Sequence, residues 1–157
     1  MATPTQIKDR IVTMLAQVEG VTTSLDDYQA QDAPFTDAQL PVAVTRLVST
    51  QQGPVTATRT HIAAGIILER WQIPIILHVK RASNTDVLSP NTAEMEACEP
   101  FLRSIPLFFL QHPRLKPALV YDTEPMANTG IVRIDRPGIV YWGIVFNLPV
   151  LEEVTYG

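Results

Sequence analysis

The fold is decided by one stretch of sequence, Trp71-Gln72-Ile73-Pro74-Ile75-Ile76-Leu77-His78-Val79-Lys80. Every second residue from Trp71 to Val79 is apolar, which is the pattern of a strand that packs one face against a core. The opposite face mixes polar and apolar side chains. Pro74 has no N–H to donate to a neighbouring strand, so it predicts a bulge or an edge position there.

Further strands are predicted on both sides of this stretch. Short strands are expected at 21–25 and 119–121, a strand at 40–48, and strand character from Thr56 on, with breaks, to Arg81. A hairpin is predicted with strands 131–135 and 139–150, because Arg136-Pro137-Gly138 is typical of a tight turn. Strand 139–150 carries large apolar residues on both faces and is therefore expected to be central. Of its neighbouring aromatic residues Tyr141 and Trp142, one is expected to point away from the core.

Two helical regions are predicted. Thr3-Pro4-Thr5-Gln6 has the pattern of a capped helix start, and apolar residues at spacings of three and four extend the first helix over 4–18. A second region begins at Asn91 or Thr92 and runs to about Leu110. Pro100 and Pro106 must disturb it, and either two segments or one kinked helix satisfies the pattern.

The order of helix, strands, helix and strands predicts an α+β fold. We expect a largely antiparallel or mixed sheet with two helices packed on one face and long ordered loops. One such loop is expected over 26–39, anchored by Tyr28 and Phe35. The length of 157 residues is that of a single domain, 1–157.

The composition predicts a surface that another chain covers. Charged residues make up 18% of the chain, against roughly 25% in an average soluble domain. The net charge of −4 disfavours a basic groove for nucleic acid. No apolar run is long enough to cross a membrane, and the first residues lack a signal-peptide pattern, so we expect a soluble protein of the cytosol or of a particle.

The residues that carry chemistry form no recognisable constellation. His61, His78 and His112 have no metal-ligand spacing, and the single cysteine, Cys98, lies on an apolar helical stripe where a buried thiol packs. We therefore predict no catalytic residue, no metal ligand and no cofactor, and the chain is not expected to be an enzyme.

The arrangement of elements resembles the tail terminator proteins of long-tailed bacteriophages, of the lambda type. The resemblance covers most of the chain as a pattern and contains no diagnostic motif. It consists of the N-terminal helix from Thr3 to Val18, the strand that begins Leu-Pro-Val-Ala-Val at Leu40, the segment Leu68–Val79, the helix before His112-Pro113, and the strand 139–150. The chain departs from the family in Pro100 and Pro106, which leaves the shape of the second helix open.

The resemblance implies a structural virion protein that assembles in the host cytoplasm. Such proteins form a homo-hexameric ring at the head-proximal end of the tail. The ring ends polymerisation of the major tail tube protein and offers a face to the head-completion proteins of the neck. DNA passes through the ring without specific binding. The family has no catalytic residue, cofactor or membrane contact to carry over.

Three alternative functions stay open at this point. A head-completion (neck or stopper) protein would share the size, the ring and the acidic isoelectric point, about 5.3. A tail protein of a related particle is the next alternative. A small cellular ligand-binding domain or enzyme is the more distant one.

Three groups of residues are predicted to make contacts in such a ring. The region 40–81 is rich in bases and residues 1–39 in acids, so complementary charges are expected to set the subunit register. The predicted interface comprises Arg46, Arg70, Trp71, Lys80 and Arg81.

The predicted tube or neck contact comprises Gln51, Gln52, Gly53, Pro54 and Arg59, in a segment 50–60 expected to be mobile in the free subunit. The predicted lining of the channel comprises Asp26, Asp27, Asp32 and Asp37, with a solvated loop on the outer rim as the alternative.

Overall fold

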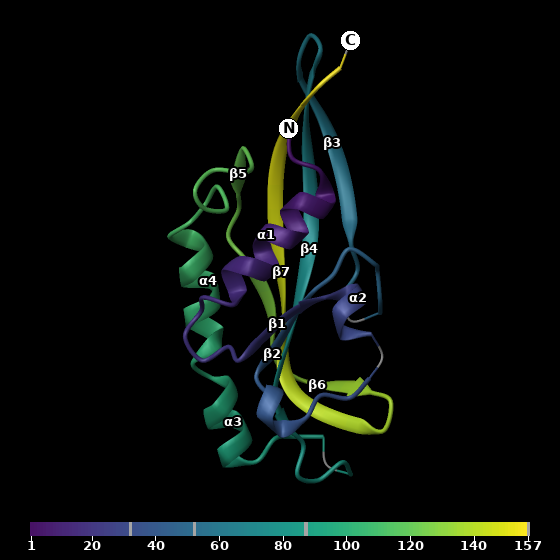
Figure 1. Cartoon of the computed structure of the whole chain (residues 1–157), viewed down its shortest axis with the longest axis vertical. Helices are drawn as coiled ribbons and strands as arrows, with labels where there is room; N and C mark the ends of the chain where they lie inside the picture. The colour runs from purple at the N-terminus through teal and green to yellow at the C-terminus, as the bar shows by residue number, and fades with distance from the viewer. Residues whose placement is uncertain (32, 52, 87, 157) are drawn as a thin grey trace.

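The structure is a computed structural model that describes residues 1–31, 33–51, 53–86 and 88–156. Along the chain, a helix, a short strand and two short helical segments precede a group of strands, a pair of helices and a second group of strands (Figure 1). They are α1 (Pro4–Leu15), β1 (Thr23–Asp26), α2 (Asp27–Ala30), η1 (Asp37–Gln39), β2 (Val42–Thr45), β3 (Thr56–Ala63), β4 (Ile66–Arg81), α3 (Thr92–Cys98), α4 (Phe101–Leu110), β5 (Asp122–Thr123), β6 (Ala127–Arg136) and β7 (Ile139–Thr155).

The two longest strands, β4 and β7, form the centre of a seven-stranded sheet. They pair antiparallel from Ile66 opposite Thr155 to Arg81 opposite Tyr141. On one side of this pair lie β3 and β2, which both pair with β4, and β1 pairs with β2. On the other side β5 and β6 both pair with β7. The β1–β2 pair is parallel and the others are antiparallel, so the sheet is mixed, and the predicted α+β class and central 139–150 strand are confirmed.

Pro74 lies where β4 exchanges one partner strand for another. Pairing with β3 ends at Gln72, and pairing with β2 begins at Ile75. The amide of Arg46 donates to the carbonyl of Pro74 at 3.2 Å, so the proline nitrogen also faces this gap, because both backbone groups of an extended residue point to the same side. The predicted edge position is therefore correct locally, whereas the bulge in β4 lies between His78 and Lys80.

The sheet is covered on both faces. The larger core packs α1, α3 and α4 against one face, through Ile11, Ile105, Ile75 and Ile144 among others. A second, smaller core on the opposite face comprises Ala30, Phe35, Val42, Val44, Ile76, Ile134, Tyr141 and Val145.

The second core corrects the prediction that one aromatic residue of β7 points outward. Tyr141 is 0% exposed and Trp142 is 2% exposed. Trp142 belongs to the helix-side core, and Tyr141 belongs to the core that segment 27–40 and β6 close. Neither residue is therefore available for a subunit interface.

The helix starts agree with the sequence. Thr3 Oγ1 accepts from the amide of Gln6 at 3.2 Å, and Gln6 Oε1 accepts from the amide of Thr3 at 2.9 Å, which completes the predicted capping box. The second helical region takes the broken form. Asn91 caps α3, which ends at Cys98, and α4 begins after Pro100 and contains Pro106.

Other local predictions need correction. The segment 26–39, predicted as a loop, includes two short helices, α2 and η1. It is anchored by Phe35 and not by Tyr28, which is 82% exposed. The short strand expected at 119–121 lies instead at Asp122–Thr123. Within the described ranges, no helix is long and apolar enough to cross a membrane.

Candidate assembly surface

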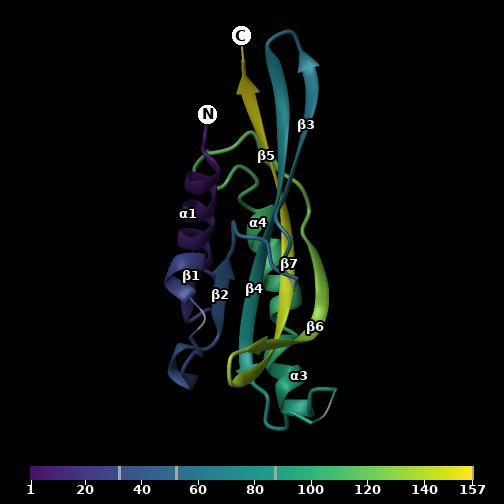
Figure 2. The ribbon, with the colours of Figure 1, turned by 90° about the vertical axis from the view of Figure 1, so that its right-hand side faces the viewer.

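The β3–β4 hairpin and the end of β7 form an arm that extends beyond the body of the protein (Figure 2). Gly65 in the hairpin turn has φ +74°, a conformation that glycine adopts without strain. Its carbonyl accepts from the amide of Tyr156 at 2.8 Å. The turn is thus tied to the end of β7, and the three strands form one unit.

The outer edge of the arm is an unpaired strand. All eight residues of β3 are exposed, and in the described part of the chain β3 pairs with β4 alone. At about 3.4 Å per residue, the free edge is roughly 27 Å long. Exposed edges attract further strands, and proteins protect them with charged side chains, proline, β-bulges or short length. β3 contains no proline, it carries one charged residue, Arg59, and its register with β4 is irregular between His61 and Ala63.

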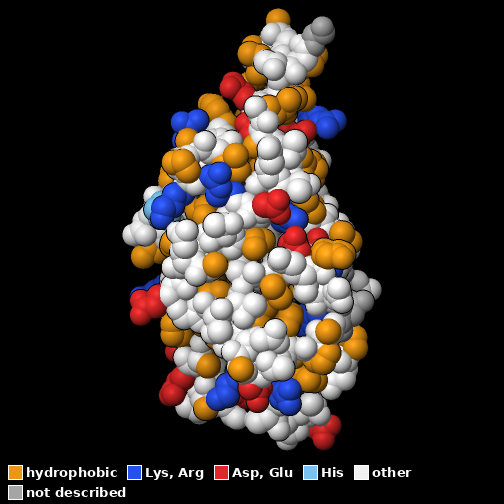
Figure 3. Space-filling model, in the orientation of Figure 1, with side chains coloured by type: hydrophobic (Ala, Val, Ile, Leu, Met, Phe, Trp, Pro, Cys, Tyr) orange, Lys and Arg blue, Asp and Glu red, His pale blue; other side chains and the backbone are white. Residues whose placement is uncertain are grey.

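The tip of the arm is apolar and lies outside both cores. Ile62 is 50% exposed and Tyr156 is 52% exposed, while Ile66, Ile67 and Val154 are half-buried. The N-terminal segment reaches the sheet only as far as Glu152, whose Oε2 accepts from the amide of Ala2 at 3.2 Å. Figure 3 shows mostly uncharged surface at this end of the molecule. A sheet tip of this kind leaves apolar surface in water until another surface covers it.

Three of the four bases predicted at the interface, Arg46, Arg70 and Arg81, are already paired within the chain. Arg70 forms an ion pair with Glu124 at 2.6 Å, and the indole N–H of Trp71 donates to Glu69 at 2.6 Å. Arg59, which was assigned to the contact loop, lies on β3 and pairs with the same Glu69 at 3.1 Å.

Two further ion pairs join the acid-rich and base-rich regions of one chain. Arg46 pairs with Asp27 at 3.1 Å, and Arg81 pairs with Asp37 at 3.7 Å. Lys80 is exposed beside Arg81, at the end of β4 away from the arm. The predicted interface residues thus do not come together on one surface, and part of the complementary charge assigned to neighbouring subunits acts within the subunit.

The predicted contact loop is a hydrogen-bonded turn that packs on β4. The amide of Gly53 donates to Thr50 Oγ1 at 3.0 Å, and a Cβ at Gly53 would lie 3.0 Å from Cβ of Pro74. Gln51 and Pro54 flank it and are exposed, whereas Gln52 lies outside the described residues. Segment 50–60 is therefore buried against β4 at Gly53, and its residues 56–60 belong to β3.

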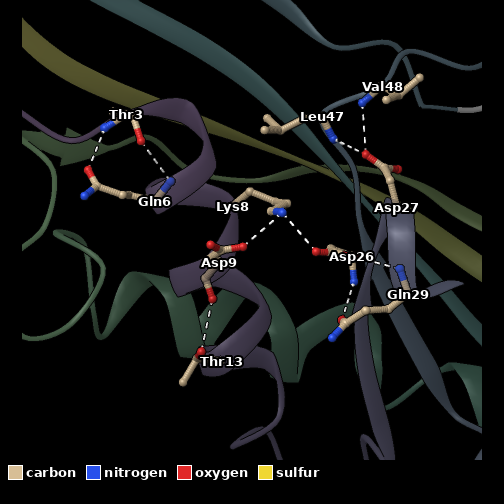
Figure 4. Close-up of polar contacts among 10 residues, drawn as sticks. All are labelled: Thr3, Gln6, Lys8, Asp9, Thr13, Asp26, Asp27, Gln29, Leu47 and Val48. Atoms are coloured by element: carbon tan, nitrogen blue, oxygen red, sulfur yellow. Dashed lines mark hydrogen bonds and ion pairs between the residues drawn. The ribbon is translucent and has the colours of Figure 1, made fainter.

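Asp26 and Asp27, two of the predicted aspartates, make separate contacts (Figure 4). Asp26 caps α2 by accepting from the amide of Gln29 at 2.8 Å and also accepts from Lys8 Nζ at 2.9 Å. The Gln29 amide and then Lys8 hold the pKa of Asp26 below its ordinary value, against the effect of burial.

Asp27 and Asp37 have different surroundings. Asp27 Oδ2 accepts from the amides of Leu47 and Val48 at 2.6 and 3.0 Å and so fixes the chain after β2. The side chain of Asp37 is 77% exposed, and Asp32 lies outside the described residues. Among the residues that the structure describes, no three His, Cys, Asp or Glu side chains come together in a metal-binding group.

Cys98 is buried in the helix-side core. Burial and the charge of Glu94 raise the pKa of Cys98 to about 11, which disfavours a reactive thiolate. His61 lies near the tip of the arm, 6.2 Å from the ring of Tyr156, and His112 follows α4 next to Phe108.

One cavity was not foreseen from the sequence. It has a volume of about 430 Å³ and lies beside His78, on the sheet face opposite α1. Three segments that are distant in the sequence form it, 46–51, 76–78 and 134–137. No local pattern could reveal such a cavity, because its lining depends on the pairing of β4 with β2 and β7.

Comparison of the sequence with family models finds no match, and comparison with curated proteins finds none either.

Proposed function

We propose that the protein is a structural virion protein that forms a ring, caps the tail tube, ends its polymerisation and joins the tail to the neck. In this proposal the ring is a homo-hexamer at the head-proximal end of the tail, in contact with the major tail tube protein and a head-completion protein. The tail role comes from the resemblance. The assembly role has support in the structure.

The observation that carries self-assembly is the arm. It combines an exposed eight-residue edge strand with an apolar tip that belongs to neither core. The exposed edge of a sheet can pair with a strand of another chain. Burial of the apolar side chains at the tip would stabilise such a contact by about 25 cal/mol per Å². A contact of this arm with a different surface of the next copy is head-to-tail, which is the contact type that generates rings.

Assembly can be tested with a pair of matched variants. Ile62→Lys places a charge on the tip of the arm, and Leu107→Lys places one on α4, where Leu107 is similarly exposed at 54%. We expect wild type and Leu107→Lys to form rings by light scattering and electron microscopy, and Ile62→Lys to remain monomeric with an unchanged circular dichroism spectrum. A wild-type protein that stays monomeric at high concentration would refute the ring. If Ile62→Lys forms rings as stable as those of wild type, the arm is not part of the subunit interface.

The tail role needs a second experiment with the tube protein from the same particle. A terminator added during tube assembly should produce tubes of limited length with a ring at one end. A protein that binds heads but leaves tube length unchanged would instead be a head-completion protein.

A further inference from the structure

The cavity beside His78 is lined by charged and hydrogen-bonding side chains. Arg46, Thr50, His78, Asp135 and Arg136 contribute polar groups, and Ile76 and Ile134 contribute apolar walls. Its volume, about 430 Å³, is within the usual range of ligand pockets, roughly 300–1,000 Å³. It is therefore large enough for a whole side chain or a small organic molecule.

Arg46 has unused hydrogen-bonding capacity in this cavity. Its side chain is 19% exposed, and its Nε forms the ion pair with Asp27 and a long hydrogen bond of 3.4 Å to the carbonyl of Val48. A guanidinium group carries five N–H donors. Among the described residues, no other acceptor receives a hydrogen bond from Arg46, so its terminal amino groups are available to an occupant of the cavity.

The positive charges of Arg46 and Arg136 act on His78, which lines the cavity. Burial, and then the charges of Arg136 and Arg46, lower the pKa of His78 to about 4. His78 is therefore neutral at pH 7. The lining carries two guanidinium groups and one carboxylate, Asp135, which itself pairs with Arg133 at 3.1 Å. A single negative charge fits this balance, whereas Asp135 would repel a dianion.

We propose that the cavity binds a carboxylate group, presented by an acidic side chain of another protein chain. The planar fork of a guanidinium group matches a carboxylate in a bidentate geometry. The apolar walls, Ile76 and Ile134, would contact the methylene groups of the same side chain. Thr50 and Gln51 place the cavity beside the loop predicted to contact the tube or the neck, although the proposal does not depend on the ring.

The test uses two probes that differ only in charge, N-acetyl-glutamate amide and N-acetyl-glutamine amide. The ring signals of His78 are followed by NMR at pH 7 and constant ionic strength. We expect a saturable shift with the glutamate probe, none with the glutamine probe, and at least tenfold weaker binding in Arg46→Gln. Arg46→Lys, which keeps the charge beside Asp27 but loses the fork, should bind less tightly than wild type, and Arg70→Gln should bind normally.

Three results would overturn the proposal. Equal shifts with both probes would exclude recognition of charge, and unchanged binding in Arg46→Gln would exclude this cavity. Sodium acetate that binds as tightly as the glutamate probe would identify a free small acid as the occupant instead of a protein side chain. Assembly is measured separately, so a monomeric protein that binds the glutamate probe would refute the ring and leave the cavity's role intact.

Discussion

The hydroxyl of Tyr141 accepts a 2.8 Å hydrogen bond from the amide of Phe35 and donates a 3.1 Å hydrogen bond to its carbonyl. The two residues are 106 positions apart, and all three polar groups are buried. This pair fastens segment 27–40 to the centre of the sheet and closes the smaller core.

Tyr141→Phe should therefore destabilise the protein although it removes a single oxygen. It would leave a buried N–H and a buried C=O without partners, which costs roughly 1–3 kcal/mol per group. Urea unfolding should show a lower free energy of unfolding for Tyr141→Phe, whereas Tyr121→Phe, at a side chain that is 50% exposed, should unfold like wild type. Equal stability of the two variants would contradict the role of this hydrogen-bonded pair.

His78 should make the protein less stable in mild acid. Its pKa is about 4 in the folded protein, below the ordinary 6.5, so the unfolded chain binds the proton more readily. Its contribution is complete above pH 6.5 and is lost as the pH falls toward 4. The lost free energy is about 3 kcal/mol from the difference in pKa.

Chemical unfolding between pH 7 and pH 4 tests this prediction. Phe35 and Tyr141 pack against the His78 ring, and Nδ1 lies 3.3 Å from the carbonyl oxygen of Val42. Burial and the charges of Arg136 and Arg46 outweigh this carbonyl and disfavour the imidazolium. In His78→Gln the loss between pH 6.5 and 4 should shrink, whereas His61→Gln should keep the wild-type profile because His78 still titrates. A His78→Gln profile as steep as that of wild type would assign the acid sensitivity to other groups.

Asp27 should matter for stability more than for any channel. Asp27→Ala removes the acceptor of two backbone N–H groups and one partner of Arg46, so we expect a loss of about 1–3 kcal/mol. Asp37→Ala, at an exposed side chain, should change the free energy of unfolding by less than about 0.5 kcal/mol. Similar losses in both variants would mean that the Asp27 contacts contribute little.

Gly143 lies where the two central strands leave no room for a side chain. A Cβ at this position would collide with the carbonyl of Leu77 and lie 2.7 Å from Cδ1 of Ile134. Gly143→Ala should thus separate β4 from β7 and be among the most destabilising single substitutions. Gly130→Ala meets no atom within 4 Å and should cost only the strain of its positive φ, about 1–2 kcal/mol, by thermal unfolding.

The sequence was sufficient for the elements whose signals are local. The capping box at Thr3 and Gln6 and the alternation from Trp71 to Val79 each fit within a few residues, and both agree with the structure. The hairpin turn at 136–138 is a similarly short-range pattern.

The remaining features depend on contacts between distant segments. The alternation of apolar and polar residues in a sequence does not show whether both faces of a strand are covered. The burial of both Tyr141 and Trp142 in β7 was therefore missed. Regional charge counts likewise could not tell that Arg46 pairs with Asp27 inside the chain. The arm was missed for the same reason. β3 is exposed because no distant segment of the described chain packs against it, and its own sequence does not show this.

The last prediction separates two ways in which the subunits could associate. If complementary surface charges drive assembly, raising the salt concentration to about 1 M shortens the screening length to roughly 3 Å and should dissociate the oligomer. Arg70 and Arg81 already pair with Glu124 and Asp37 within the chain, and the arm offers backbone groups and apolar side chains. We therefore expect the oligomer to persist in high salt. The double variant Arg70→Glu/Arg81→Glu should lose less assembly than Ile62→Lys when both are measured by light scattering over a concentration series. Dissociation of the oligomer in 1 M salt would show that charge, and not the arm, drives assembly. The same conclusion would follow if the double variant assembled less than Ile62→Lys.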